Sequence, residues 1–295
     1  MNDTLRYDYI TNKMRKFFRD EKGFVEVPYS SRLSILAACE DPKTVTTFTM
    51  GGQCWPLPQT GQMWLEVELL KNPHWKGAFC LGTSYRNEPN PIPGRHNLMF
   101  PMFEFEAPGD FEALKKLERE LVEYMGFSAP VSLAYEAACK QYNCSEIKSD
   151  QETLMDVDFG HSVSLERFPL RAHPFWNMKY TGDNFFNKID VILHGAETIG
   201  SAERATNPEE MRDFFFTVSD GDYAALLFKY FGKDRVMSEL ENYFALNFFQ
   251  RFGGGIGVTR MERAMERAGL LDHLPVHEQT YFEPMVQVQQ RQVSL

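Results

Sequence analysis

Residues 82–106 read GTSYRNEPNPIPGRHNLMFPMFEFE, and this stretch contains the pattern that decides the fold. A first arm runs to Glu88, a loop with three prolines and a glycine follows, and a second arm runs from about Arg95 to Glu106. Proline and glycine interrupt strand ladders and favour turns. The stretch therefore predicts two strands joined by a charged loop.

Side chains that suit a nucleotide are concentrated on this hairpin. It carries Arg86, Glu88, Arg95 and His96, and the aromatic Phe100 lies nearby. Guanidinium groups bind phosphate oxygens, and an aromatic ring offers a face to a base. The set indicates a site for a nucleoside triphosphate; the alternative is an exposed hairpin whose charges are solvated.

A second informative stretch is FGGGIGVTRMERAM, residues 252–265. A glycine run and a small apolar strand lead to Arg260, which opens a predicted helix. Glycines let the backbone approach a ligand closely, and a helix N-terminus favours anions. Together the two stretches resemble motifs 2 and 3 of the class II aminoacyl-tRNA synthetases, in the same order and about 150 residues apart.

Composition describes an ordinary globular protein of 295 residues, 43% hydrophobic and 24% charged. The net charge of −10 gives no general attraction for RNA. No secretory signal and no membrane-length apolar run are present, so a cytoplasmic protein that does not contact membranes is expected. Cysteines without CxxC spacing predict free thiols. They are Cys39, Cys54, Cys80, Cys139 and Cys144.

The order of predicted elements extends the resemblance over nearly the whole chain. A helix from Thr4 to about Asp20, followed by a strand and Pro28, resembles motif 1, which forms the dimer interface of class II enzymes and so implies a homodimer. Further helices are predicted at 110–125, 131–142, 207–215, 223–231 and 236–249, and strands at 77–85 and around 185–200. Residues 33–57 are expected to be irregular, and 149–170 have no assigned structure.

The fold that the resemblance implies is α+β. We expect one catalytic domain over residues 1–295, with a mostly antiparallel, six- to seven-stranded sheet of the class II synthetase type, flanked by helices. The chain starts directly at the motif 1 helix. We therefore expect it to lack the N-terminal barrel of about 100 residues that reads the anticodon in family members.

Three spacings place the resemblance closest to the aspartyl- and asparaginyl-tRNA synthetases and the archaeal-type asparagine synthetase. Asp190 and Glu197 are seven residues apart, and so are Glu197 and Arg204. The resemblance assigns the two carboxylates to the ATP–Mg²⁺ site and Arg204 to the side chain of the bound amino acid. Two carboxylates on adjacent segments can hold Mg²⁺ against phosphate oxygens; the alternative is strand-end charges that face solvent.

The loop LPQTGQ, residues 57–62, resembles the one that closes over the amino acid. By that resemblance Gln62 lies near the substrate amino group, with Glu40 as its acidic partner. Aspartyl enzymes carry lysine where this chain has Leu65, followed by Glu66. A glutamate accepts hydrogen bonds from a carboxamide while Arg204 donates to its carbonyl, and it repels a second carboxylate. The pattern favours asparagine over aspartate; alternatively, Glu66 forms a salt bridge within its helix.

The chemistry implied by the resemblance is attack of an amino-acid carboxylate on the α-phosphate of ATP, which yields an aminoacyl adenylate. Arg86 would hold the α-phosphate and the carboxylate, and Arg260 the γ-phosphate; these are the expected catalytic residues. The other ATP contacts would be Glu88 to the adenine amine, Phe100 stacked on the ring, and Arg95 or His96 at the outer phosphates.

Three departures from the family concern the acceptor and the glycine strand. Met99 stands where members usually have glutamate, prolines fill the loop that touches the tRNA end, and Arg251 precedes the glycine strand where members have histidine or proline. We therefore expect an ATP-dependent ligase that activates asparagine or aspartate for a non-tRNA acceptor, with tRNA binding left open. The alternatives are an asparagine synthetase, a truncated tRNA synthetase, and a non-catalytic paralogue that serves as a binding subunit.

Overall fold

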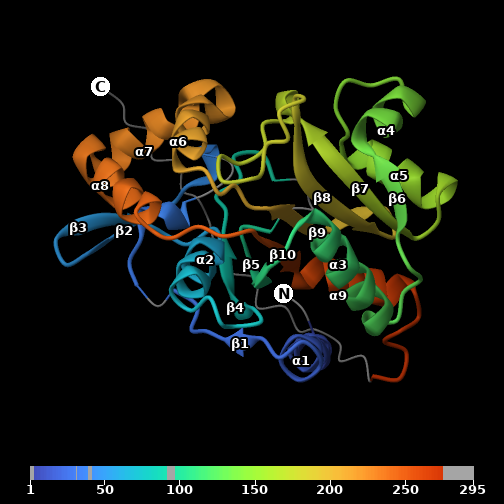
Figure 1. Cartoon of the computed structure of the whole chain (residues 1–295). Helices are drawn as coiled ribbons and strands as arrows, with labels where there is room; N and C mark the ends of the chain where they lie inside the picture. Colours follow the sequence, from blue (N-terminus) through green and yellow to red (C-terminus); the bar gives the residue numbers. More distant parts are fainter. Residues whose placement is uncertain (1–2, 31, 39–41, 92–96, 275–295) are drawn as a thin grey trace, which may run out of the picture.

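The computed structural model describes residues 3–30, 32–38, 42–91 and 97–274 (Figure 1). Three of the residues proposed from the sequence, Glu40, Arg95 and His96, lie outside the described residues, as does Cys39. The four described cysteines are free thiols, as predicted. No helix in the described ranges is long and apolar enough to cross a membrane.

An eight-stranded sheet forms the centre of the described chain. Its six inner strands pair antiparallel, and β1 and β6 add parallel edges, so the expected α+β, mostly antiparallel sheet is confirmed. In spatial order the strands are β1 (Val25–Glu26), β4 (Ala78–Tyr85), β5 (Met99–Pro108), β10 (Arg251–Gly257), β9 (Ala196–Glu203), β8 (Phe185–Leu193), β7 (Ser162–Pro169) and β6 (Val131–Ala134).

The expected number of six to seven strands was wrong because of two segments between residues 131 and 170. The helix predicted over 131–142 begins only at Tyr135; residues 131–134 pair with β7 as the edge strand β6. Residues 149–170, unassigned from the sequence, form a helix and then β7. Strand formation depends strongly on packing against neighbouring strands, which these segments do not reveal from their sequence alone.

The hairpin predicted from residues 82–106 is the β4–β5 pair, with Ala78 opposite Glu106 and Tyr85 opposite Met99. Alternation along β5 separates two faces. Phe103 and Phe105 are fully buried in the main core, where each ring lies 5.1 Å from Phe18. Glu104, between the two phenylalanines, and Glu106, after them, then point to the opposite face, where the candidate site lies.

Three helices cover the core face of the sheet (Figure 1). They are α1 (Thr4–Arg15, continued by a π-helical turn, Lys16–Glu21), α3 (Phe111–Met125) and α9 (Val258–Arg267). Asp3 caps α1 by accepting hydrogen bonds from Leu5 N and Arg6 N at 2.9 and 3.1 Å. This layer leaves the other face of the sheet available for the site.

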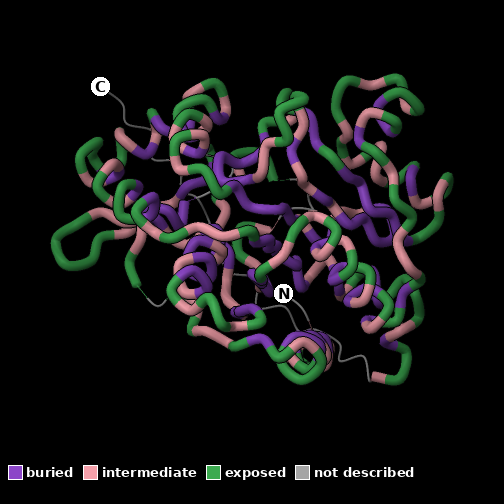
Figure 2. The backbone as a smooth tube through the Cα atoms, in the orientation of Figure 1, coloured by how far each residue is buried: buried purple, intermediate pink, exposed green. Residues whose placement is uncertain are grey.

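Two further groups of helices lie at the ends of the sheet, and Figure 2 shows buried strands running between their exposed surfaces. One group packs around Trp176: α2 (Gln62–Lys71), α6 (Pro208–Thr217), α7 (Asp222–Phe231) and α8 (Lys233–Phe244). The other packs on β7: α4 (Tyr135–Gln141) and α5 (Ser149–Asp158). The segment expected to be irregular contains a hairpin, β2 (Thr47–Met50) and β3 (Gln53–Pro56).

Short helical turns complete the described elements. They are Ile35–Ala37, Pro42–Thr44, Leu170–Ala172 and Val218–Gly221. The helices predicted at 207–215 and 223–231 are present as α6 and α7, and the one predicted at 236–249 is α8, which ends five residues earlier, at Phe244.

Candidate active site

A cavity of about 250 Å³ lies on the sheet face that carries Glu104. Its walls come from the ends of β4 and β5, the glycines of β9 and β10, and the start of α2 and α9. Six residues proposed from the sequence line it, although they are spread over nearly 200 positions: Gln62, Arg86, Glu88, Phe100, Glu197 and Arg260. Sheet pairing, and not proximity in sequence, brings them together.

The hairpin places an arginine beside an aromatic ring at one end of this cavity. Phe100 lies opposite Ser84 in the ladder, and Arg86 N donates to Leu98 O at 2.8 Å just beyond it. The Arg86 guanidinium carbon is 5.6 Å from the centroid of the Phe100 ring, within the range of a cation–π contact. Glu88 N donates to Arg86 O at 2.9 Å, which makes a tight turn, and both residues line the cavity.

Glu197 and Gly200 line the cavity, and Asp190 does not line it but lies close to Gly200. Asp190 lies opposite Gly200 across the β8–β9 pair, and Gly200 lies opposite Gly255 across the β9–β10 pair. A Cβ atom on Gly200 would lie 3.1 Å from Glu197 Oε1 and 3.5 Å from Asp190 Oδ1. The glycine thus leaves open the space between two carboxylates, whose oxygens are ligands of the kind that Mg²⁺ prefers.

Cations balance these two carboxylates in different ways. Lys188 forms an ion pair with Asp190, while Arg260 Nη1 donates to Glu197 O at 2.7 Å and to Glu197 Oε2 at 3.3 Å. Burial raises the pKa of Asp190 to about 7, against the opposing charge of Lys188 and with support from Glu197. Burial also acts to raise the pKa of Glu197, but Arg260, Lys188 and Arg86 outweigh it, so that pKa is lowered. The pair therefore carries one firmly ionised carboxylate and one that titrates near neutrality.

Arg204 lies at the end of β9, behind the cavity wall, and is 1% exposed. Its Nε donates to Glu106 Oε1 at 3.0 Å, and its Nη2 donates to Glu106 Oε1 at 2.5 Å and to Gln62 Oε1 at 2.9 Å. Because Gln62 lines the cavity, Arg204 is one side chain away from it. Burial raises the pKa of Glu106 to about 8, with Glu66 adding to the effect and Arg204 opposing it.

Glu66 has protein partners that the sequence did not predict. It is fully buried, it does not line the described cavity, and other groups occupy both of its oxygens. Oε2 accepts from Arg251 Nη2 at 2.6 Å and from Tyr243 Oη at 2.7 Å, and Oε1 accepts from Asn177 Nδ2 at 2.6 Å. The ion-pair partners of Glu66 are Arg204 and Arg251, which lie outside its helix, so the expected salt bridge within the helix is wrong. Contact between Glu66 and a substrate amide stays a prediction.

Arg251, Tyr243, Asn177 and Glu104 are the residues of this region that the sequence did not reveal. The sequence contained one signal for Arg251: it stands where family members have histidine or proline. Its pairing with the buried Glu66 could not be predicted from that departure. Glu104 is fully buried and accepts from Gly61 N at 2.7 Å and from the Thr60 hydroxyl. It therefore holds in place the loop 57–62, which the sequence had associated with the amino acid.

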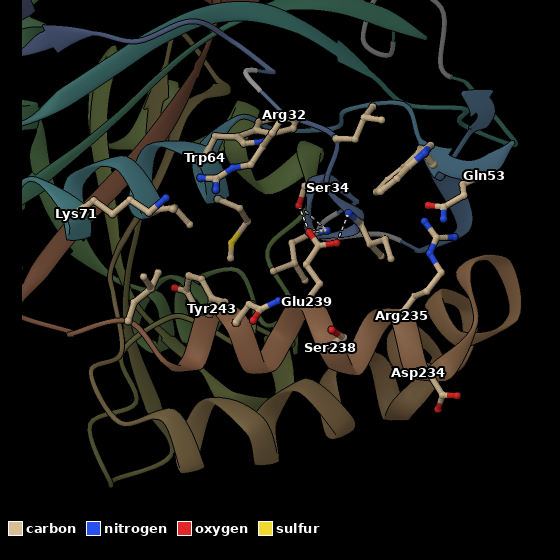
Figure 3. A pocket seen from close by; sticks show the side chains of 18 residues that line it. Arg32, Ser34, Gln53, Trp64, Lys71, Asp234, Arg235, Ser238, Glu239 and Tyr243 are labelled. Carbon is tan, nitrogen blue, oxygen red and sulfur yellow. Dashed lines mark hydrogen bonds between the residues drawn. The ribbon is translucent and has the colours of Figure 1, made fainter. Parts of the chain in front are cut away.

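A larger cavity of about 710 Å³ lies between α2, α8 and the β2–β3 hairpin (Figure 3). Glu239 points from α8 toward the turn at residues 34–36, where it accepts from Ile35 N at 3.0 Å. Arg235 lies over the Trp55 ring, 4.7 Å from its centroid. None of the described residues proposed from the sequence lines this cavity. Its wall includes Tyr243, which binds Glu66.

Comparisons with known proteins agree with this geometry. A family model described as tRNA synthetases class II (D, K and N) matches residues 2–265. Asparaginyl-tRNA synthetase from Pyrococcus horikoshii, complexed with asparaginyl-adenylate, superposes with a TM-score of 0.73 at 16% identity, covering 89% of this chain and 64% of that one. The Entamoeba histolytica asparaginyl-tRNA synthetase complex with asparaginyl-adenylate gives 0.70 at 18% identity, covering 88% of this chain and 63% of that one.

Aspartyl-tRNA synthetase from Entamoeba histolytica is similar as well, with a TM-score of 0.64 at 18% identity, covering 90% of this chain and 55% of that one. This chain therefore spans less than two thirds of the length of these three solved structures. At such identities the superpositions establish a shared fold. The expected resemblance to the asparaginyl and aspartyl catalytic core is confirmed at that level.

Proposed function

This chain belongs to the family of class II tRNA synthetases (D, K and N), and we propose that it uses ATP to activate asparagine or aspartate as an aminoacyl adenylate for an acceptor other than tRNA. The observation that carries the proposal is the convergence of Arg86, Phe100, Glu197 and Arg260 on one cavity. Guanidinium groups bind phosphate oxygens and an aromatic ring can stack on a base, so this set suits a nucleoside triphosphate.

The proposed reaction needs positioning and charge stabilisation more than acid–base chemistry. A carboxylate oxygen of the amino acid bonds to the α-phosphorus of ATP while the bond to the bridging oxygen of pyrophosphate breaks, and no proton has to move. Arg86 stabilises the charge that builds up on the α-phosphate, and Arg260 holds the γ-phosphate of the leaving group. Preorganised donors of this kind supply a large share of catalysis in enclosed sites.

ATP would enter with its adenine on Phe100 and its 6-amino group toward the Glu88 carboxylate. Arg95 or His96 would reach the outer phosphates. Asp190 and Glu197 would hold Mg²⁺, because two hard oxygen donors flank the open space at Gly200. When bound, this ion neutralises phosphate charge.

The amino acid would bind at Gln62, with Glu40 as the partner of its amino group and Arg204 directed to its side-chain oxygen. Glu66 acts here through Arg204, because Glu66 Oε1 lies 3.7 Å from Arg204 Nε and the carboxylate itself is enclosed. Arg251 compensates the charge of Glu66. Glu66 therefore discriminates less against aspartate than the sequence pattern indicated, and both amino acids remain in the proposal.

Arg251 also favours a second candidate, the ligation of aspartate with ammonia to give asparagine. With Glu66 neutralised by Arg251, a substrate carboxylate would face Arg204 without an uncompensated negative neighbour. In this reaction the side-chain carboxylate, and not the α-carboxylate, would attack the α-phosphate of ATP and release pyrophosphate. Ammonia would then attack the β-aspartyl adenylate, form the side-chain amide and release AMP. Adding ammonia to an aspartate-dependent reaction, and measuring asparagine, separates this candidate from the first.

The acceptor is proposed to be an amine of a small molecule or a protein rather than tRNA. The net charge of −10 disfavours a polyanion. Leu98 and Met99, at the end of the hairpin beside the cavity, are 53% and 61% exposed, and apolar side chains there suit an acceptor with apolar surface.

We further propose a cytoplasmic homodimer that pairs through α1 and β1. Leu5 on α1 and Val25 on β1 are exposed apolar side chains, and β1 is an edge strand. Exposed edges and apolar positions of this kind are suited to pairing with a second copy. Measuring the mass in solution, with Leu5→Glu as the disruptive variant, tests this assembly.

The test of the enzymatic proposal is ATP–pyrophosphate exchange with a panel of amino acids and without tRNA. Exchange is expected with asparagine or aspartate. Arg86→Ala and Arg260→Ala should each lower it by at least about 100-fold, the loss typical of one removed charge-stabilising donor. Arg263→Ala is the matched control, because Arg263 is an exposed residue on the same helix as Arg260.

Two outcomes would contradict the proposal. Absence of exchange with every amino acid, in protein that is folded by circular dichroism, would refute adenylate formation in the absence of an acceptor. Transfer of the activated amino acid to tRNA would refute the proposed class of acceptor. If the chain is instead a non-catalytic binding subunit, the Arg86→Ala variant should still bind the same partner as wild type.

A further inference from the structure

A cluster of two imidazoles and a carboxylate lies outside both cavities described above. Asp156 belongs to the last turns of α5, His161 follows that helix, and His194 is in the turn between β8 and β9. Among the residues that the structure describes, the possible ligating atoms of these three side chains lie within 4.8 Å of one another. None of them was selected from the sequence.

Backbone contacts hold the two histidines in place. His194 and Gly195 both have left-handed φ angles, 47° and 75°, which is the conformation of a two-residue hairpin turn. A Cβ atom on Gly195 would lie 3.1 Å from Thr153 Cα, so the turn is seated directly against α5. His194 N donates to His161 O at 2.9 Å, and Arg267 Nη1 donates to His194 O at 2.6 Å.

The three side chains lie close together, and His161 is on the solvent-exposed side of the cluster. The rings of His161 and His194 stack with centroids 4.5 Å apart and planes 12° apart, and His161 Nδ1 lies 2.9 Å from Asp156 Oδ1. His194 is 9% exposed, whereas the His161 side chain is 65% exposed.

We propose that Asp156, His161 and His194 bind one divalent transition-metal ion of the zinc type, with solvent at the remaining position. Two imidazole nitrogens and one carboxylate oxygen are a donor set for such ions, whereas Mg²⁺ prefers oxygen ligands only. Bonds of about 2.0–2.1 Å to zinc place tetrahedral ligand atoms about 3.4 Å apart. The present cluster closes to that size through rotation of His161, which is the exposed member.

The ion would fasten the β8–β9 turn to α5. A second contact already joins the same elements, since Glu197 N donates to Glu152 Oε2 on α5 at 3.1 Å. The hairpin held in this way carries Asp190 and Glu197 to the candidate active site. The role is therefore structural: the bound ion stabilises the support of the site and takes no part in the reaction. The inference does not rest on the proposed function.

The experiment is a titration of chelator-treated, tag-free full-length protein with Co²⁺, followed by its visible absorption, and then competition with Zn²⁺. Wild type is expected to bind a single equivalent of Co²⁺ with nitrogen-ligand absorption, and Zn²⁺ is expected to displace it. His161→Ala and Asp156→Asn should each weaken binding at least about tenfold. His74→Ala, an exposed histidine elsewhere, is the matched control and should bind as wild type does.

Thermal unfolding supplies an independent readout, because an ion that binds the folded state raises the midpoint. Zn²⁺ should raise the midpoint of wild type and of His74→Ala, and should raise it less in the other two variants. The proposal is overturned if wild type binds Co²⁺ and Zn²⁺ no more tightly than ~100 µM. Binding by His161→Ala and Asp156→Asn equal to that of wild type would overturn it as well.

Discussion

Replacing Glu118 by glutamine should stabilise the protein, and increasingly so as the pH rises. Glu118 lies on α3, is 2% exposed, and accepts from Ser201 Oγ at 2.5 Å through Oε1. Its Oε2 has no hydrogen-bond partner in the described part of the chain. Burial raises its pKa from 4.5 to about 8, opposed by the Ser201 hydrogen bond and supported by Asp190 and Glu166.

The sign and size of the effect follow from proton linkage. Above pH 4.5 the unfolded chain loses the Glu118 proton, whereas the folded chain keeps it up to about pH 8. The folded state therefore binds more protons in this window, and its stability falls as the pH rises. At pH 7 the cost is about 3 kcal/mol, since each unit of pKa shift corresponds to about 1.4 kcal/mol. Glutamine removes this cost and can still accept the hydrogen bond from Ser201.

The assay is urea unfolding of wild type and Glu118→Gln between pH 5 and pH 8, followed by circular dichroism. The free energy of unfolding of the variant should exceed that of wild type by about 3 kcal/mol at pH 7, and the difference should shrink toward zero near pH 4.5. Glu112→Gln, whose side chain on the same helix is 78% exposed, is the control and should show no such trend. A difference that does not change with pH would refute the assignment of a raised pKa to Glu118.

Three further predictions concern the candidate site. Gly200→Ala places a Cβ atom 3.1 Å from Glu197 Oε1, in the space proposed for Mg²⁺. The Mg²⁺ concentration for half-maximal pyrophosphate exchange should therefore rise about tenfold. An unchanged Mg²⁺ dependence would count against the proposed ion site. Arg251→Met leaves the buried Glu66 without the cation of its closest ion pair. The free energy of unfolding, measured by urea titration, should fall by about 3–5 kcal/mol. Adding Glu66→Gln should restore part of that free energy, because the uncompensated buried charge is then removed. Burial raises the pKa of Asp190 to about 7, and Mg²⁺ binds the ionised carboxylate. The apparent affinity for Mg²⁺ should therefore weaken below pH 7 and level off above pH 8. An affinity that stays constant between pH 6 and pH 8 would contradict this.

Local pattern was sufficient for much of the fold, and six of the residues proposed from the sequence line one cavity. Prolines and glycine between two apolar arms indicated the β4–β5 hairpin, and the glycine run before Arg260 indicated β10 and α9. The resemblance assigned Asp190 and Glu197 to one site, and the structure places them on β8 and β9, with their oxygens close to Gly200. These features depend on strand alternation, turn residues and glycine, each of which acts over a few residues.

Only the tertiary structure decided which partners the buried charges have. Glu66 and Arg251 are 185 residues apart, and their pairing, which removes Glu66 from the cavity, depends on how α2 packs against β10. The Asp156, His161 and His194 cluster likewise exists only because the β8–β9 turn is seated on α5. A charge in sequence carries no mark of its burial, and desolvation by distant segments determines whether it is solvated, paired or available to a ligand.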